Sequence, residues 1–191
     1  MTLLLLMLSI LAGQNGQDVP KPVPVIIETS AGEIEAEIDF VHAPITAANF
    51  LKYVDAGLFD GGRFFRTVRA DNQVDKPVKI AVIQAEGNRD RRREFFAAIP
   101  LERTSVTGLT HKDGTLSMAR STPDTARDSF SICVGDQPAL DFAGGRQPDG
   151  QGFAAFGHVV RGMDVVRAIQ MGPATGETLT PAVAIVRVRR R

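Results

Sequence analysis

The chain has 191 residues, and its 22 lysine and arginine residues are matched by 22 aspartate and glutamate residues, so the formal net charge is zero. This balance excludes the strong overall field with which many proteins hold nucleic acid or an anionic membrane surface. Behind a predicted leader about 170 residues remain, which is enough for one domain with a sizeable core and too few for two ordinary ones.

The amino terminus has the pattern of a secretory signal peptide. Residues 1–12 are almost wholly apolar, and the polar residues 13–18 follow, as at the exit of a signal sequence. We therefore expect residues 1–18 to be a signal peptide and the protein to be exported to the periplasm. The alternative is a disordered or mis-started amino terminus, because no lysine or arginine precedes the apolar run. Residues 19–24 are proline-rich and predict an extended linker into the folded domain, residues 25–191.

The first elements of the domain are a hairpin and a helix. Residues 25–29 and 33–38 flank a short turn, and polar and apolar residues alternate in the second run, as expected for two antiparallel strands. Pro44 and Gly57 then stand at the favoured first position of a helix and just beyond its favoured end. The sequence therefore predicts a helix between them.

The middle of the chain predicts short strands separated by polar turns. Residues 63–68 and 80–85 read as two strands joined by a polar loop, residues 69–79. We interpret this loop as a surface excursion that leaves both strands undisturbed. The alternative is an extra rim to a groove. The remaining predicted elements are strands at residues 115–119, 129–134, 153–156 and 182–188 and a helix at residues 163–171.

Many short strands with one helix near each end favour a closed antiparallel barrel. Alternation alone does not choose between a barrel and a sandwich. A cluster of arginines at residues 89–93 reads as a solvated loop. Cys133 is the only cysteine, so an intramolecular disulfide is excluded, and its apolar neighbours predict a small buried side chain.

Several motifs occur in order along the chain. An arginine follows two aromatic residues in Phe64-Phe65-Arg66, and Gln84 follows the next apolar run. Two further segments read Gly-Thr-Leu-Ser-Met-Ala-Arg, residues 114–120, and Phe-Gly-His-Val-Val-Arg-Gly-Met, residues 156–163. This ordered set resembles the cyclophilin family of peptidyl-prolyl cis-trans isomerases. The resemblance implies a mainly β protein, a closed eight-stranded antiparallel barrel with two capping helices.

The same resemblance implies which residues form the site. Arg66 would be the catalytic arginine, and Gln84 would be the glutamine that accompanies it. The residues of the substrate groove would be Val82, Ala119, Arg120, Ser129, Ser131, Leu140 and Phe153.

The apolar half of this groove differs from the family pattern. Ser131 stands where a phenylalanine is usual, Ala139 replaces a large aromatic residue, and Val82 is smaller than its usual counterpart. Burying a phenylalanine-sized group is worth about 1.5 to 3 kcal/mol, so proline binding is expected to be weaker unless other residues refill the space. Phe142 and Phe153 are the candidates for this refilling.

A guanidinium group suits the rotation of a prolyl peptide bond. The barrier is about 18 to 20 kcal/mol because the nitrogen shares its lone pair with the carbonyl. In the twisted transition state the nitrogen becomes pyramidal and accepts a hydrogen bond, which the fixed, charged donor fork of Arg66 can supply. Gln84 both donates and accepts, which suits the holding of the peptide.

We expect no cofactor and no metal site. His42, His111 and His158 lie far apart, without the paired spacing of metal ligands, and are expected at the surface or in loops. Residues 149–152 predict a turn and not a calcium loop, because too few oxygen ligands follow. The expected partners are proline-containing unfolded or extended polypeptides, and no nucleic acid. We expect a monomer that meets a membrane only through an uncleaved leader.

Two other functions stay open. A cyclophilin-like module with little or no turnover would bind proline-containing peptides, and the small residues of the groove favour it. A barrel with a hollow interior would bind a small apolar ligand, although the bulky apolar residues along the strands predict a filled interior. The isomerase is the function we expect, because Arg66 and Gln84 are both present.

Overall fold

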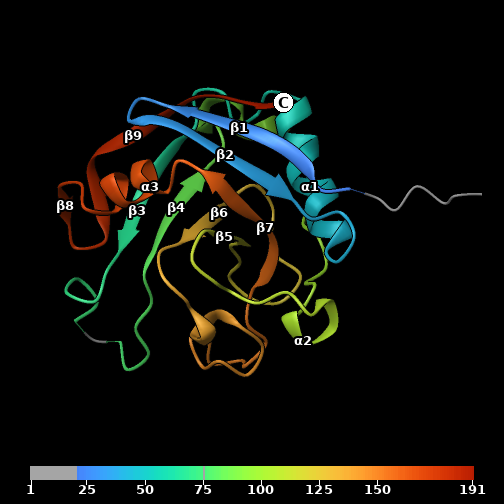
Figure 1. The fold of residues 1–191 in the computed structure, drawn as a ribbon, viewed down its shortest axis with the longest axis vertical. Helices are drawn as coiled ribbons and strands as arrows, with labels where there is room; N and C mark the ends of the chain where they lie inside the picture. Colours follow the sequence, from blue (N-terminus) through green and yellow to red (C-terminus); the bar gives the residue numbers. More distant parts are fainter. Residues whose placement is uncertain (1–20, 75) are drawn as a thin grey trace, which may run out of the picture.

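The computed structural model describes residues 21–74 and 76–191, so the predicted signal peptide and the start of the predicted linker lie outside the described residues. The chain winds into an antiparallel barrel with helices packed against it (Figure 1). The strands are β1 (Val23–Thr29), β2 (Gly32–Ile38), β3 (Arg63–Val68), β4 (Val82–Glu86), β5 (Thr115–Met118), β6 (Phe130–Cys133), β7 (Ala154–Arg161), β8 (Ala174–Thr175) and β9 (Thr178–Arg190). The helices are α1 (Pro44–Asp55), α2 (Thr104–Thr107) and α3 (Met163–Gln170), with 3-10 turns η1 (Arg89–Glu94) and η2 (Pro138–Leu140).

Eight strands close the barrel. They hydrogen-bond in the order β1-β2-β7-β5-β6-β4-β3-β9, and β1 pairs again with β9. Every pairing is antiparallel. The two-residue strand β8 adds a ninth strand beside β9, outside the closed ring. The predicted barrel is confirmed, and its closure gives each of the eight strands a partner on both sides.

The first hairpin follows the sequence pattern. Thr29 pairs with Gly32 across a two-residue loop. Gly32 has a φ of +134°, and a Cβ atom there would lie 2.8 Å from a methyl carbon of Val165 in α3, so both backbone conformation and packing require glycine. The predicted linker is too long, because β1 already begins at Val23, which pairs with Ile38 of β2.

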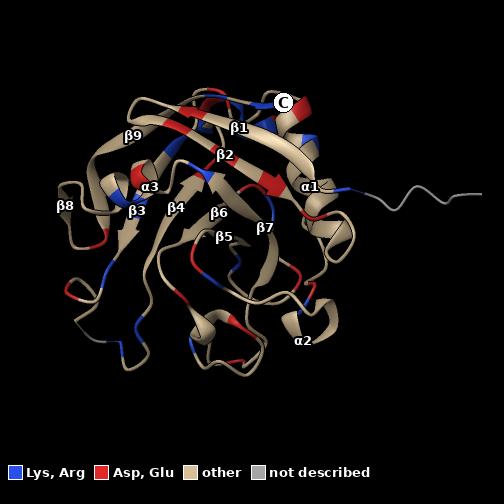
Figure 2. Ribbon diagram, in the orientation of Figure 1, with Lys and Arg blue, Asp and Glu red and all other residues tan. Residues whose placement is uncertain are grey.

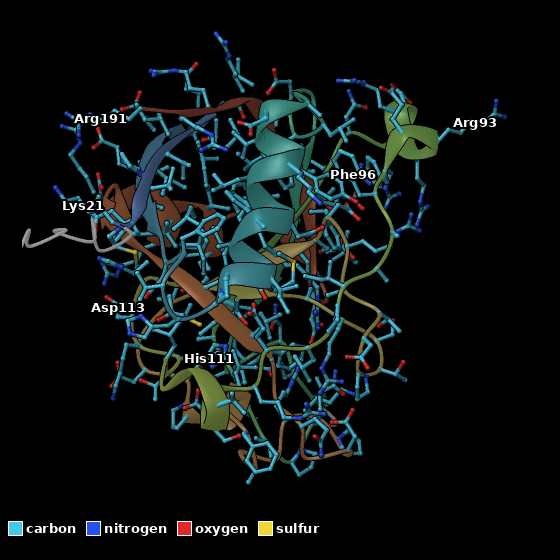
Figure 3. All side chains as sticks on the ribbon, turned by 90° about the vertical axis from the view of Figure 1, so that its right-hand side faces the viewer. Lys21, Arg93, Phe96, His111, Asp113 and Arg191 are labelled. Atoms are coloured by element: carbon cyan, nitrogen blue, oxygen red, sulfur yellow. The ribbon has the colours of Figure 1, made fainter. Side chains whose placement is uncertain are left out.

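Helix α1 begins and ends as predicted and contributes to the core. Pro44 is its first residue, and Gly57 has a φ of +61° just beyond its end, the left-handed conformation that glycine adopts easily. The ring centre of the buried Phe50 lies 5.3 Å from those of Phe130 and Phe156. Figure 3 looks onto α1, which lies across the barrel. Side chains therefore pack through the described part of the barrel, which agrees with the expected filled interior.

The structure differs locally from the sequence predictions. Strands β7 and β9 are longer than the predicted strands at residues 153–156 and 182–188. Strand β4 begins at Val82 and not at residue 80, because the backbone of Ile80 bonds to the side chain of Gln73 in the preceding loop. The arginine cluster is solvated as predicted but forms the 3-10 turn η1, from which Arg93 points away from the molecule (Figure 3). The sequence does not predict α2, because a helix of four residues shows no apolar period.

Candidate functional site

Strands β3 to β6 and two loops enclose a pocket of about 560 Å³. The loop between β3 and β4 and the loop between β6 and β7 hang from the same end of the barrel (Figure 1). Both loops contribute walls, through residues 76–78 and 80 and through residues 145–148. Of the predicted site residues the pocket is lined by Arg66, Val82, Gln84, Ala119, Arg120, Ser131, Leu140 and Phe153.

Arg66 lies in β3, and its guanidinium is held from two sides. Nη1 donates a hydrogen bond to Oε1 of Gln84 at 2.8 Å. Nε and Nη2 donate to Oε2 of Glu177 at 2.8 and 2.5 Å, and Glu177 lies in the turn between β8 and β9. A guanidinium has five N–H donors, of which these bonds use three. Arg66 is therefore fixed in place and still has two N–H donors for a ligand.

A chain of hydrogen bonds sets the orientation of the Gln84 amide. Its Oε1 accepts from Arg66, and its Nε2 donates to Oγ of Ser129 at 3.0 Å. Ser129 donates in turn to the carbonyl oxygen of Ala85 at 2.7 Å. The structure does not place Ser129 in the pocket wall, because its hydroxyl is turned to Gln84 and Ala85. Its role in the groove stays a prediction.

A small apolar cluster, separate from the main core, lies beneath the pocket. Its buried members are Val68, Ile80, Val82, Cys133 and Leu140, and Ala139 and Phe153 pack against them. Ile80, Val82, Leu140 and Phe153 form the apolar floor of the pocket itself. Burial raises the pKa of the Cys133 thiol, so this cysteine is a packing residue, as predicted.

Phe142 does not refill the pocket, contrary to the prediction. It is 42% exposed, and its backbone N–H donates to Oγ1 of Thr104 at 2.9 Å, which ties it to α2 away from the pocket. Phe153 does line the pocket, as predicted. Ile80, at the end of the β3–β4 loop, supplies apolar surface that the sequence pattern assigned to a strand.

Arg120 builds a wall of the pocket and is already neutralised. Its side chain is 0% exposed, and Nη1 and Nη2 donate to the two carboxylate oxygens of Asp149 at 2.7 and 2.9 Å. The hydrogen bond from Arg120 lowers the pKa of Asp149 to about 2. The guanidinium also lies 5.2 Å from the centre of the Phe153 ring, which orients that ring.

The β3–β4 loop forms one rim of the pocket and is not a neutral excursion. Gln73 at its centre is 2% exposed, and its Nε2 donates to the carbonyl oxygens of Arg69 and Ile80 at 2.6 and 2.7 Å. Arg146, from the β6–β7 loop, donates through Nη1 to Oε1 of Gln73 at 2.8 Å and to the carbonyl oxygen of Val78 at 2.6 Å. The two loops are thus bonded to each other where they line the pocket.

His111 lies in the loop between α2 and β5, in agreement with the expectation of a surface or loop position, but it is buried. It is 1% exposed and lies between α1 and α2 in the view of Figure 3. Nδ1 bonds to Oδ1 of Asp141 at 2.7 Å, and Nε2 bonds to Oγ of Ser117 at 2.8 Å. Burial lowers the pKa of His111 against the raising effect of Asp141, which favours the neutral ring with Nδ1–H donating to Asp141. Ser117 is 2% exposed, so the arrangement ties the β6–β7 loop to β5.

Two polar residues of the site, Glu177 and Arg146, have no signal in the sequence, because each lies in a turn or loop without a recognisable motif. Among the described residues, no group of three or more His, Cys, Asp or Glu side chains is placed to hold a metal ion. The described helices include none that is long and apolar enough to cross a membrane.

Comparisons with known proteins agree with this geometry. Residues 24–190 match the family model described as cyclophilin type peptidyl-prolyl cis-trans isomerase/CLD. Peptidyl-prolyl cis-trans isomerase cyp18 of Streptomyces antibioticus is 34% identical over 155 residues, which are 81% of this chain and 86% of that protein. Peptidyl-prolyl cis-trans isomerase B of Escherichia coli is 32% identical over 155 residues, 81% of this chain and 87% of that protein.

The fold has a solved counterpart. The crystal structure of a cyclophilin type peptidyl-prolyl cis-trans isomerase of Cryptosporidium parvum superposes with a TM-score of 0.69 at 18% identity, over 89% of this chain and 98% of that one. With the family match and the relatives, these findings show that the chain belongs to the cyclophilin-type peptidyl-prolyl cis-trans isomerase family.

Proposed function

We propose that this protein is a peptidyl-prolyl cis-trans isomerase that accelerates rotation about X-Pro bonds in client polypeptides, with Arg66 as its catalytic residue. The observation that carries the proposal is the guanidinium of Arg66, which is fixed by Gln84 and Glu177 and keeps two N–H donors free in a pocket with an apolar floor. Membership of the isomerase family supports the same reaction.

The chemistry follows from the electronic structure of the peptide bond. Uncatalysed exchange takes tens to hundreds of seconds, because twisting removes the conjugation between nitrogen and carbonyl. In the twisted state the prolyl nitrogen carries a localised lone pair. A free N–H donor of Arg66 directed at that nitrogen stabilises the twisted state and not the planar ground states, so the barrier falls.

One hydrogen bond does not account for the whole acceleration. A charge-assisted bond contributes about 1.5 to 3 kcal/mol, whereas an acceleration of about 10⁵ needs about 7 kcal/mol. The remainder must come from holding the proline while the preceding carbonyl turns. Val82, Leu140 and Phe153 offer an apolar seat for the pyrrolidine ring, and Gln84 lies beside Arg66 to hold the backbone.

The test is cis-trans exchange measured by NMR on short Xaa-Pro peptides. Arg66→Ala is expected to slow catalysed exchange about 10- to 150-fold, the equivalent of one charge-assisted bond. Arg66→Lys is expected to lose nearly as much, because an ammonium on a flexible stem lacks the planar donor fork that bonds to Gln84 and Glu177 and still directs donors at the substrate. Arg63→Ala is the matched control, since Arg63 lies in the same strand but pairs with Glu86 at 2.8 Å outside the pocket wall.

Each outcome separates one possibility. Exchange at the uncatalysed rate on every peptide would reject the enzymatic function. Equal exchange by wild type and Arg66→Ala would reject the role of Arg66. Peptide binding without exchange would identify the protein as a binding module.

We also propose that the protein is exported and monomeric. The apolar run followed by polar residues within residues 1–18 supports export. Closure of the eight-stranded ring supports a monomer, because these strands have no open edge for a second copy. Cell fractionation with amino-terminal sequencing tests the first statement, and light scattering tests the second. A full-length chain in the cytoplasm, or a stable dimer, would reject the respective statement.

A further inference from the structure

The pocket carries more positive charge than rotation of a prolyl bond requires. Its lining includes the cations Arg66, Lys76, Arg120 and Arg146, and none of its described lining residues is acidic. Glu177 neutralises Arg66, and Asp149 neutralises Arg120. The ion pairs of the described residues include neither Arg146 nor Lys76.

Among the residues that the structure describes, Arg146 is held in place by neutral groups only. Its Nη1 donates to the amide oxygen of Gln73 and to the carbonyl oxygen of Val78, which fixes the side chain against the β3–β4 loop. Nε and Nη2 make no hydrogen bond within the described residues. Because a guanidinium presents its donors as a planar fork, the unused edge of Arg146 is shaped for an oxyanion.

The surroundings of Arg146 disfavour an isolated charge. The residue is half-buried, and burial, followed by the nearby charge of Arg66, lowers the pKa of Arg146, against a smaller opposite effect of Glu177. A half-buried cation beside a second cation gains free energy when an anion binds. Figure 2 shows basic as well as acidic segments on both loops at the lower end of the barrel, and of these loops residues 76–78, 80 and 145–148 line the pocket.

We propose that the pocket selects proline segments that carry an oxyanion, a carboxylate or a phosphate, on a residue next to the proline, and that Arg146 binds this oxyanion with Lys76 as a supporting charge. This inference rests on the proposed function, because it assumes that the proline of the client lies on the apolar floor beside Arg66. Both cations line the same pocket as Arg66, Val82 and Phe153, so one peptide can contact the floor and the cations together. An acidic flanking residue then supplies the counter-charge that the described residues do not give Arg146.

The experiment compares peptides that differ only at the residues flanking the proline. The peptides are Ala-Xaa-Pro-Ala-Phe and Ala-Ala-Pro-Xaa-Phe, with glutamate, glutamine or phosphoserine as Xaa. Exchange by NMR and binding by calorimetry are measured for each peptide with wild type, Arg146→Gln, Arg146→Lys and Lys76→Gln. Arg127→Gln is the matched control, because Arg127 also donates to backbone carbonyl oxygens, of Phe95 and Phe96, but lies outside the pocket.

In at least one of the two registers, with Xaa either before or after the proline, wild type is expected to bind the glutamate peptide about 3- to 10-fold more tightly than the glutamine peptide. This ratio is that of a partly exposed charge-assisted bond. Arg146→Gln is expected to bring this ratio close to one, Arg146→Lys to keep part of it, and Arg127→Gln to leave it unchanged. Raising the salt concentration from about 50 to about 500 mM should reduce the wild-type ratio. A larger preference for phosphoserine than for glutamate would identify phosphate as the source of the oxyanion, and the reverse order a carboxylate.

Equal binding of the glutamate and glutamine peptides by wild type in both registers would overturn the inference, and so would a preference that survives Arg146→Gln. If Arg146→Gln fails to fold, the salt dependence of wild type and the ratio in Lys76→Gln decide the question. A charge preference that depends on Arg146 without any catalysed exchange would keep the anion site and reject the proposed function. Catalysed exchange on the glutamate and the glutamine peptide without a charge preference would keep the proposed function and reject the anion site.

Discussion

Replacement of Glu177 tests whether a carboxylate outside the predicted site prepares Arg66 for catalysis. Oε2 of Glu177 accepts from Nε and Nη2 of Arg66 at 2.8 and 2.5 Å. These bonds occupy one edge of the guanidinium and leave free donors for the prolyl nitrogen. If the main role of Glu177 is to hold Arg66 in one orientation, its removal must slow the reaction, although it leaves Arg66 a less neutralised cation.

The size of the effect follows from the exposure of the pair. Bonds to charged groups contribute about 1.5 to 3 kcal/mol when well shielded, but the side chains of Arg66 and Glu177 are 32% and 26% exposed. Solvent screening reduces the contribution to about 1 kcal/mol, which corresponds to about a 5-fold change in rate. We therefore expect Glu177→Ala to lower kcat/KM about 5-fold. Glu177→Gln should recover most of this loss, because an amide oxygen still accepts from the guanidinium.

The assay is NMR exchange on a neutral Xaa-Pro peptide, so that a changed net charge of the pocket has little influence on binding. Glu28→Gln is the matched control, since Glu28 pairs with Arg189 at 2.8 Å with a similar exposure of 34%, away from the pocket. Faster exchange with Glu177→Ala than with wild type would refute the reasoning and identify Glu177 as a brake on Arg66. Equal losses in the alanine and glutamine variants would show that the negative charge matters, and not the orientation.

Three further predictions concern groups around the pocket. Because burial lowers the pKa of His111 in the folded protein, the unfolded chain takes up a proton first, and the free energy of unfolding should fall below pH 6.5 by up to about 1.4 kcal/mol per pH unit. Denaturant titrations from about pH 8 to pH 5 should show this slope in wild type and not in His111→Gln; parallel curves would contradict it. Cys133, which is 0% exposed, should react with a thiol reagent only after unfolding, and Cys133→Ser should cost about 1 to 3 kcal/mol of stability; rapid labelling of the native protein would show that the pocket floor opens. Gln73→Ala leaves the backbone of Ile80 and a donor of Arg146 without their partner. We therefore expect the free energy of unfolding, measured with denaturant, to fall by about 1 to 3 kcal/mol, together with a weaker glutamate preference. An unchanged denaturation midpoint would mean that water replaces the amide.

Local patterns predicted the elements whose residues interact mainly with their neighbours in sequence. Alternation in residues 33–38 marks the half-buried strand β2, and Pro44 and Gly57 mark the limits of α1, because these signals depend on backbone conformation and on one apolar face. The interpretation of the β3–β4 loop as a surface excursion does not account for its role as a rim of the pocket, for a related reason. Its polar residues are typical of a solvated loop, and nothing local shows that the buried Gln73 satisfies the backbone around it.

The order of the motifs was sufficient to identify the family, the barrel and the pair formed by Arg66 and Gln84, which face each other across adjacent strands. The surroundings of this pair are not visible in the sequence and come from the folded arrangement. Glu177 reaches Arg66 from 111 positions away in sequence, and Arg146 reaches Gln73 from 73 positions away. Such contacts depend on barrel closure, which brings loops of distant sequence to the same end, whereas apolar periodicity encodes only which face of each strand is buried. Sequence motifs are therefore sufficient to predict the fold and the polar pair of the site, whereas the way that pair is held and the charges that line the pocket follow from contacts between distant loops.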